Sequence, residues 1–257
     1  MILAVNVGNT HVVFGLVDGK NVLHPVMNIK TDMNQTPYGY ASEMKQILSL
    51  CGFGGHKIDG VIISSVVPPL TQTVKEAAGI LTDGDVLTVG AGVKSGIHIL
   101  TDDPGSVASD LVAAAVGAKA EYKLPCVIVD MGTAVTLTVV DGNGRFIGGA
   151  FLPGVKVSLS ALAEEASLLP DIDVIPPKKA IASSTVECMR SGTIYGYAGA
   201  VDGIIDRFAE ELGCEPETII TTGKIAELIC SYTKRKTVND SDLLLKGLGL
   251  IFDKNRR

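Results

Sequence analysis

The feature that most constrains the fold of this 257-residue chain is an internal repeat. Residues 4–19 read AVNVGNTHVVFGLVDG, and residues 128–142 read IVDMGTAVTLTVVDG. In each copy an apolar segment leads to a polar residue, Asn6 or Asp130, then to a Gly and a Thr, and then to a second apolar segment ending in Asp-Gly. Alternating β-branched residues around a Gly-containing turn predict a β-hairpin, and Asp-Gly predicts a second turn. Two copies about half a chain apart predict two similar halves.

The remaining sequence alternates between helix-like and strand-like segments. We expect the halves to span 1–117 and 118–257, with the boundary at an Ala-rich helix over 110–119. Further helices are predicted over 42–50, 70–81, 157–168, 186–212 and 243–255, and strands over 59–67, 86–89 and 217–222. Thr71 or a neighbour is the expected cap of the second of these helices. Alternating strands and helices indicate an α/β fold, and the leading hairpins predict mixed sheets.

Composition excludes several classes of protein. Hydrophobic residues make up 46% and charged residues 19% of the chain, which is enough for a core of Val, Ile, Leu and Ala. A net charge of −6 argues against nucleic acid as a partner, because phosphate contacts need a basic surface. The sequence contains no run of 18 apolar residues, so no membrane-spanning helix is predicted. Five cysteines without a CxxC spacing, and no signal-peptide pattern, favour reduced thiols and a cytoplasmic location.

The repeated hairpin turns have the composition of phosphate-binding turns. A Gly in the turn allows close approach of the backbone to a polyphosphate, and Thr hydroxyls and backbone N–H groups can donate to phosphate oxygens. The acidic residue at the start of the turn can hold Mg²⁺ directly or through water. One such turn alone is better explained as a structural hairpin. Two copies, one opening each half, favour two nucleotide-binding turns that face each other across a cleft between the halves.

Taken together, the motifs of this chain resemble those of type III pantothenate kinases in the actin/sugar-kinase superfamily. The first phosphate motif, usually Asp-x-Gly-Asn-Thr, stands at residues 6–10, and the second, Asp-x-Gly-Thr-Ala, is intact at 130–134. A Gly-Gly-x-x-x-Pro-Gly stretch occupies 148–154, and a Thr-Val-Glu-x-Met-x-Ser-Gly stretch occupies 185–192. The match runs nearly end to end and is specific at the family level.

The resemblance implies the fold, the reaction and the site residues. It implies two actin/sugar-kinase-like halves, a homodimer, and transfer of the ATP γ-phosphate to the primary hydroxyl of pantothenate, with Mg²⁺ and a monovalent cation (K⁺ or NH₄⁺) as cofactors. Asp110 would accept the proton of that hydroxyl, and Asp130 would bind the monovalent cation. Residues implied to bind ATP are Asn6, Val7, Gly8, Asn9, Thr10, His11, Val12, Val13 and Thr133. Residues implied to bind pantothenate are Thr101, Ala108, Ser109, Asp110, Leu111 and Thr185.

The chain departs from the family pattern near the implied substrate pocket. Asn6 stands in place of the first motif's Asp, Thr101 in place of a Tyr, and Leu111 in place of an Arg that would give a charge-assisted bond to the substrate. Three interpretations stay open on the sequence. The chain is a divergent but working pantothenate kinase, or a weak or inactive relative with a nucleotide-binding or regulatory role, or a kinase for another small alcohol.

Overall fold

The computed structural model of this protein describes residues 1–19 and 21–256, and these residues form two compact units. The first unit contains Met1–Glu121 together with the chain from Asp242 onward, and the second contains Tyr122–Ser241. None of the helices among these residues is long and apolar enough to cross a bilayer. Each unit is built around its own mixed sheet.

The sheet of the first unit contains the first copy of the repeat as its central hairpin. Strands β1 (Ile2–Val7) and β2 (His11–Asp18) pair antiparallel, and β1 pairs parallel with β5 (Gly60–Ser65), which pairs parallel with β6 (Asp85–Thr88). Short strands β3 (Asn21–Val22) and β4 (Met27–Lys30) extend β2 on its other side. The predicted hairpin and the mixed sheet are therefore confirmed. The short strand β7 (His98–Ile99), which is not part of this sheet, and the 3₁₀ turn η1 (Pro104–Ser106) follow β6 in the chain.

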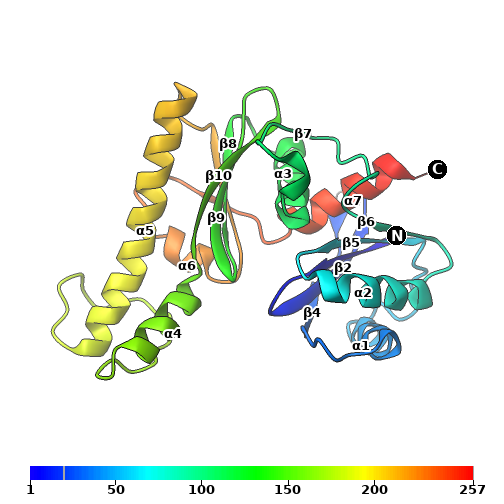
Figure 1. Ribbon diagram of the computed structural model, residues 1–257, viewed down its shortest axis with the longest axis horizontal. Helices are drawn as coiled ribbons and strands as arrows, with labels where there is room; N and C mark the ends of the chain where they lie inside the picture. Colours follow the sequence, from blue (N-terminus) through cyan, green and yellow to red (C-terminus); the bar gives the residue numbers. More distant parts are fainter. Residues whose placement is uncertain (20, 257) are drawn as a thin grey trace. The chain divides into compact units, whose positions relative to one another are not determined.

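Helices cover both faces of this sheet (Figure 1). Side chains Leu3, Val5 and Val7 of β1 point into a core that α1 (Pro37–Leu50) and α2 (Pro68–Leu81) complete. Because side chains alternate along a strand, the residues between them point to the opposite face. There α3 (Ser109–Glu121) contacts β5, and α7 (Leu243–Asn255) contacts β1, β2 and β5.

Two of these helices begin earlier than the sequence predicts. Helix α1 starts at Pro37 rather than at residue 42, because the Thr36 hydroxyl caps it by accepting the Gly39 N–H at 3.1 Å. Helix α2 starts at Pro68, since Pro is tolerated in the first turn, where its absent N–H has no helical partner. The predicted cap Thr71 is therefore inside α2, where its hydroxyl contacts Ser65 Oγ at 2.8 Å.

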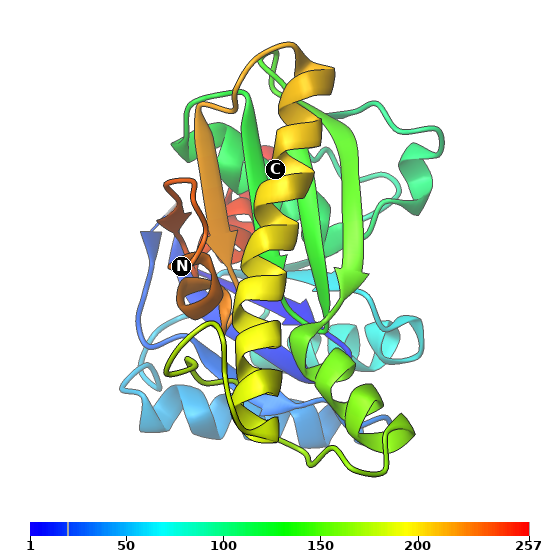
Figure 2. The ribbon, with the colours of Figure 1, turned by 90° about the vertical axis from the view of Figure 1, so that its left-hand side faces the viewer.

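The second unit repeats the hairpin and adds a long helix. Strands β8 (Cys126–Met131) and β9 (Ala134–Val140) form the second hairpin, with β10 (Arg145–Pro153) antiparallel to β9. Strand β11 (Thr218–Thr222) pairs parallel with β8 and with β12 (Val238–Asn239). Helices α4 (Val155–Glu165), α5 (Thr185–Leu212) and α6 (Ala226–Cys230) pack on one face, and Figure 2 shows α5 in yellow in front of the sheet, running roughly along its strands.

The division into units differs from the predicted halves in the placement of the last helix. The structure groups α7 with the first unit, whereas the predicted second half runs from residue 118 to 257. The physical reason is that α7 packs on β1, β2 and β5 and on α3, which it approaches most closely at two glycines. A Cβ on Gly247 would lie 1.8 Å from the Ala113 carbonyl oxygen, and one on Gly117 would lie 2.4 Å from the Leu243 carbonyl oxygen. The backbones of α3 and α7 are therefore in contact. Sequence periodicity alone does not reveal this contact.

Candidate functional site

The turn of the first hairpin is held in shape by hydrogen bonds to its backbone. Gly8 N–H donates to the His11 carbonyl at 3.0 Å, and a Cβ on Gly8 would lie 3.1 Å from that same oxygen. Thr31, just after β4, donates from its hydroxyl to the Gly8 carbonyl at 2.6 Å and from its N–H to the Thr10 carbonyl at 3.1 Å. The turn is therefore fixed from two sides, and Asn9 and Thr10 are left exposed at its tip.

The remaining residues of the 6–13 segment divide between core and surface. Val7 and Val12 are fully buried in the core of the first unit, so their side chains cannot reach a nucleotide and only their backbones can. His11 and Val13 are half-buried at the start of β2. The tip of the turn, rather than the whole segment, is thus the surface that can contact phosphate.

Asn6 lies on the sheet face opposite the α1 and α2 core. It is paired in register with Ser64 of the parallel neighbour β5, so both side chains point to the face that α3 covers. Asn6 Oδ1 is buried and has no hydrogen-bond partner. A buried acceptor without a donor costs about 1–3 kcal/mol, so such an atom indicates a place where a ligand, an ion or water completes the bonding.

Asp110 is the second residue of α3 and is half-buried at the amino end of that helix. Its Oδ1 accepts the Leu111 N–H at 2.8 Å, which holds the carboxyl group against its own helix. Burial raises the pKa of Asp110, although hydrogen bonds from the backbone of Leu111 and of Asp110 itself lower it. A carboxylate with a raised pKa is a better proton acceptor than an exposed one.

The turn of the second hairpin is one residue shorter than that of the first. Gly132 N–H donates to the Ala134 carbonyl at 3.0 Å, two residues further along the chain, whereas Gly8 N–H bonds a carbonyl three residues along. A Cβ on Gly154 would lie 2.0 Å from the Thr133 carbonyl oxygen, so the backbone of this glycine, in the Pro-Gly motif, packs directly against the turn. Thr133 itself is exposed.

Asp130 lies at the end of β8, beside the turn that follows β11. Gly223 there has a φ of +97°, which favours glycine, and a Cβ on it would lie 2.9 Å from Asp130 Oδ1 and 2.7 Å from the Met131 carbonyl oxygen. A carboxylate and a carbonyl oxygen therefore converge at a place that only glycine leaves open. Oxygen atoms of this kind are the donors that hard cations prefer.

The residues that the resemblance assigns to pantothenate lie in both units. Thr101 is half-buried, and its Oγ1 is another buried oxygen without a hydrogen-bond partner. Ala108, Ser109 and Leu111 surround Asp110 at the start of α3, all half-buried. Thr185 is exposed as the first residue of α5, whose N-cap Ser184 accepts the Glu187 N–H at 3.4 Å. The structure thus places Asn6 on the sheet face that α3 covers and Asp110 at the start of α3, within one unit, and Asp130 near Thr133 in the other.

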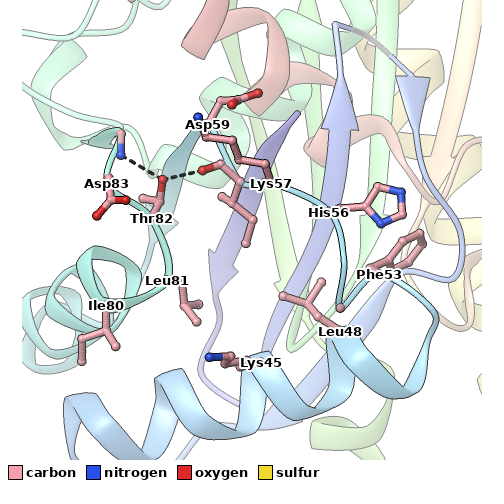
Figure 3. Close-up of a pocket in the computed structure, with 13 residues that line it drawn as sticks. Lys45, Leu48, Phe53, His56, Lys57, Asp59, Ile80, Leu81, Thr82 and Asp83 are labelled. Atoms are coloured by element: carbon pink, nitrogen blue, oxygen red, sulfur yellow. Dashed lines mark hydrogen bonds between the residues drawn. The ribbon is translucent and has the colours of Figure 1, made fainter.

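A pocket of about 460 Å³ in the first unit contains none of these residues. It lies between Lys45 and Leu48 of α1, Ile80 of α2, and the loops before β5 and β6, as Figure 3 shows. It is therefore at the amino ends of these parallel strands, whereas Asn6 and Ser64 lie near the carboxyl ends of β1 and β5. Open α/β sheets bind ligands at the carboxyl ends of their strands, so this pocket is not the candidate nucleotide site.

Sequence reasoning missed the residues that support the candidate site. Thr31 and Gly154 fix the two turns, and Ser64 and Ser65 contact the helix that carries Asp110. One available signal was the pair of polar residues inside the otherwise apolar segment VIISSVV. Thr31 gives no such signal, because its partner is a backbone carbonyl 23 residues away in sequence.

Comparison with known proteins places this geometry in a family. The family model for type III pantothenate kinase matches residues 2–207. A type III pantothenate kinase of Brevibacillus brevis is 37% identical over 256 residues, and the match covers 100% of both chains. Among solved structures, a Baf family protein of Campylobacter jejuni has a TM-score of 0.65 at 15% identity, covering 99% of this chain and 98% of its own. A ROK hexokinase of Thermus thermophilus has a TM-score of 0.55 at 13% identity, covering 99% of each chain.

The two structural likenesses concern the fold, and they confirm the predicted sugar-kinase-like α/β architecture. The sequence match reaches further, because it includes both hairpin turns, the helix that carries Asp110 and the amino-terminal part of α5. The relative from Brevibacillus brevis extends that match through α7. On these grounds, the chain belongs to the type III pantothenate kinase family.

Proposed function

We propose that this protein transfers the γ-phosphate of ATP to the primary hydroxyl of pantothenate, the first step toward coenzyme A. The observation that carries the proposal is Asp110, a half-buried carboxyl group with a raised pKa in a chain that matches the family over its full length. Phosphoryl transfer needs little covalent chemistry from a protein and depends on positioning and on neutralising charge. An oriented carboxylate and two backbone-lined turns meet those needs.

Asp110 accepts the proton of the pantothenate hydroxyl in this proposal. The hydroxyl oxygen forms a bond to the γ-phosphorus as the bond from that phosphorus to the β-phosphate oxygen breaks, and ADP leaves. The proton passes to the Asp110 carboxylate and from there to solvent. The Leu111 N–H holds Oδ1 and so fixes the orientation of the carboxyl group that would face the substrate. Exposed backbone that can bind phosphate oxygens of ATP lies around Asn9 and Thr10 in the first unit and around Thr133 in the second.

Asn6 fits a role toward Mg²⁺. Its buried Oδ1 without a hydrogen-bond partner is an oxygen donor of the type that Mg²⁺ accepts, directly or through a bound water. Being neutral, an amide attracts the ion less than the Asp of the family motif would. The ion, when bound with ATP, would neutralise phosphate charge. Asp130 with the Met131 carbonyl at Gly223 is the corresponding oxygen set for a monovalent cation, K⁺ or NH₄⁺.

A second candidate acceptor rests on Leu111. This half-buried apolar side chain follows Asp110 where the family pattern has an Arg, so the carboxylate of pantothenate lacks that cation. A small alcohol without a carboxylate would suit Leu111 better. The regulatory interpretation has no comparable support in the contacts of the described residues.

The test is a coupled ADP-release assay with purified protein, Mg²⁺, K⁺, ATP and pantothenate. We expect turnover that needs pantothenate, and lower turnover when either cation is omitted. Pantoyl alcohols without the carboxylate serve as the competing acceptors. Turnover with those alcohols but not with pantothenate would show that pantothenate is not the acceptor. ATP binding without turnover on any acceptor would contradict the kinase proposal.

We also propose that the protein works as a homodimer in the cytoplasm. Four glycines of α5, Gly192, Gly196, Gly199 and Gly203, recur at helical spacing, and an added Cβ would meet nothing within 4 Å at any of them. Such a row of glycines allows close approach of a helix from a second copy of the chain. The family resemblance implies a homodimer of this kind. All five cysteines are free thiols, which suits a reducing compartment. Sedimentation equilibrium is expected to give twice the chain mass of 26.8 kDa, and a monomer at micromolar concentration would contradict it.

A further inference from the structure

Three serines connect the central sheet of the first unit to the helix that carries Asp110. Ser64 and Ser65 are the last two residues of β5, and Ser109 is the first residue of α3. The Ser109 hydroxyl lies 2.9 Å from Ser64 Oγ, accepts the Ser65 N–H at 3.0 Å and donates to the Ser65 carbonyl at 3.1 Å. Ser64 is fully buried.

These contacts use the whole hydrogen-bonding capacity of one hydroxyl. A serine hydroxyl has one donor and two acceptor positions. If Ser109 donates to the Ser65 carbonyl, it can accept from both the Ser65 N–H and the Ser64 hydroxyl, and every position is occupied. These bonds hold the start of α3 to the end of β5, whereas an ordinary helix cap bonds only its own helix.

The sheet leaves these backbone groups of Ser65 available to Ser109. The Ile63 carbonyl accepts the Val89 N–H at 2.8 Å, so the backbone N–H and C=O groups of Ile63 point toward β6. Backbone groups alternate in direction along a strand, so those of Ser65 point the same way, beyond the end of β6 at Thr88. On the other side of Ser65, Thr71 of α2 contacts its hydroxyl at 2.8 Å. Ser65 is therefore a fixed point between two helices.

We infer that Ser109 is a positioning residue, which sets the place of the Asp110 carboxyl relative to Asn6 by fixing the start of α3 to the end of β5. Asn6 and Ser64 are paired in register on adjacent strands, so the bond from Ser64 to Ser109 links the strand that carries Asn6 to the helix that carries Asp110. This role differs from the substrate contact that the resemblance implies for Ser109. It rests on the proposed function, because positioning matters only if Asp110 acts on the substrate.

The test compares Ser109→Ala with Ser109→Thr, which keeps the hydroxyl, and with Ser106→Ala. Ser106 is the matched control, because it is exposed in the nearby turn η1 and its hydroxyl donates at 2.8 Å to the Asp103 carbonyl instead of to β5. We expect Ser109→Ala to lower kcat about tenfold and to leave the KM for ATP within about twofold, since small misplacements of a reacting group are costly. We expect Ser109→Thr to restore most of kcat and Ser106→Ala to match the parent protein.

A second measurement does not depend on activity. Hydrogen–deuterium exchange of peptides that cover the first turn of α3 is expected to speed up in Ser109→Ala and to stay unchanged in Ser106→Ala, because that turn loses its attachment to β5. Unchanged exchange would overturn the attachment itself, and faster exchange with unchanged kcat would overturn the positioning role. A parent protein without turnover would instead overturn the proposed function, and with it the catalytic meaning of the attachment.

Discussion

Replacing Asp110 with Asn is expected to lower kcat by about 10²- to 10⁴-fold, the usual contribution of a positioned acid or base. The change is nearly isosteric, and the Asn oxygen can still accept the Leu111 N–H that now bonds Oδ1. What is lost is the capacity to accept the proton of the substrate hydroxyl. The KM for ATP is expected to change little, because the backbone turns that would hold its phosphates are untouched. Initial rates of ADP release at saturating ATP and pantothenate measure the effect.

The same substitution is expected to stabilise the protein at neutral pH. Burial raises the pKa of Asp110, so the ionised carboxylate is less favourable in the folded than in the unfolded chain. That cost is absent below the unfolded pKa of about 3.9, grows as the pH rises through the folded pKa, and is complete above it. Asp110→Asn should therefore raise Tm at pH 7, by an amount that shrinks as the pH falls toward 4. The exposed Asp83→Asn is the control that should alter neither kcat nor Tm. Parent-like kcat in Asp110→Asn would exclude Asp110 as the base.

Replacing Gly247 with Ala is expected to destabilise the first unit by about 3 kcal/mol or more, at the upper end of overpacking effects. The added methyl group would lie 1.8 Å from the Ala113 carbonyl oxygen and 3.1 Å from Gly117 N, so it meets backbone rather than a movable side chain. Helices α3 and α7 would have to separate. At about 2–4 °C per kcal/mol for a chain of this size, Tm should fall by roughly 6–12 °C.

The matched control for Gly247→Ala is Gly79→Ala. Gly79 is an exposed residue of α2, and a Cβ there would meet nothing within 4 Å. Because Ala has the higher helix propensity, that change should stabilise the protein by about 0.5–1 kcal/mol. Thermal unfolding followed by circular dichroism compares the two variants. Equal Tm values for Gly247→Ala and the parent would mean that α3 and α7 do not pack through their backbones at this point.

Local pattern determined a large part of this protein. The two hairpins followed from a repeat of β-branched residues around Gly-containing turns, because that pattern acts within a dozen residues. The helix over Leu243–Asn255 was predicted to the residue, since its apolar spacing and its polar flanks are local as well. Family motifs then pointed to Asp110 and Asp130, which the structure places at a helix start and a strand end.

Only the tertiary structure decided how those elements support the candidate site. The attachment of α7 to the first unit depends on Gly117 and Gly247 meeting across two helices that are far apart in sequence. The bonds from Thr31 to the first turn and from Ser109 to β5 join residues separated by 23 and 44 positions. Hydrophobic periodicity shows which face of a helix or strand is buried, but it does not specify which backbone carbonyl that face will meet. Packing determines which residues far apart in sequence contact one another. The supporting roles of these residues can therefore be identified in the structure but not in the sequence pattern.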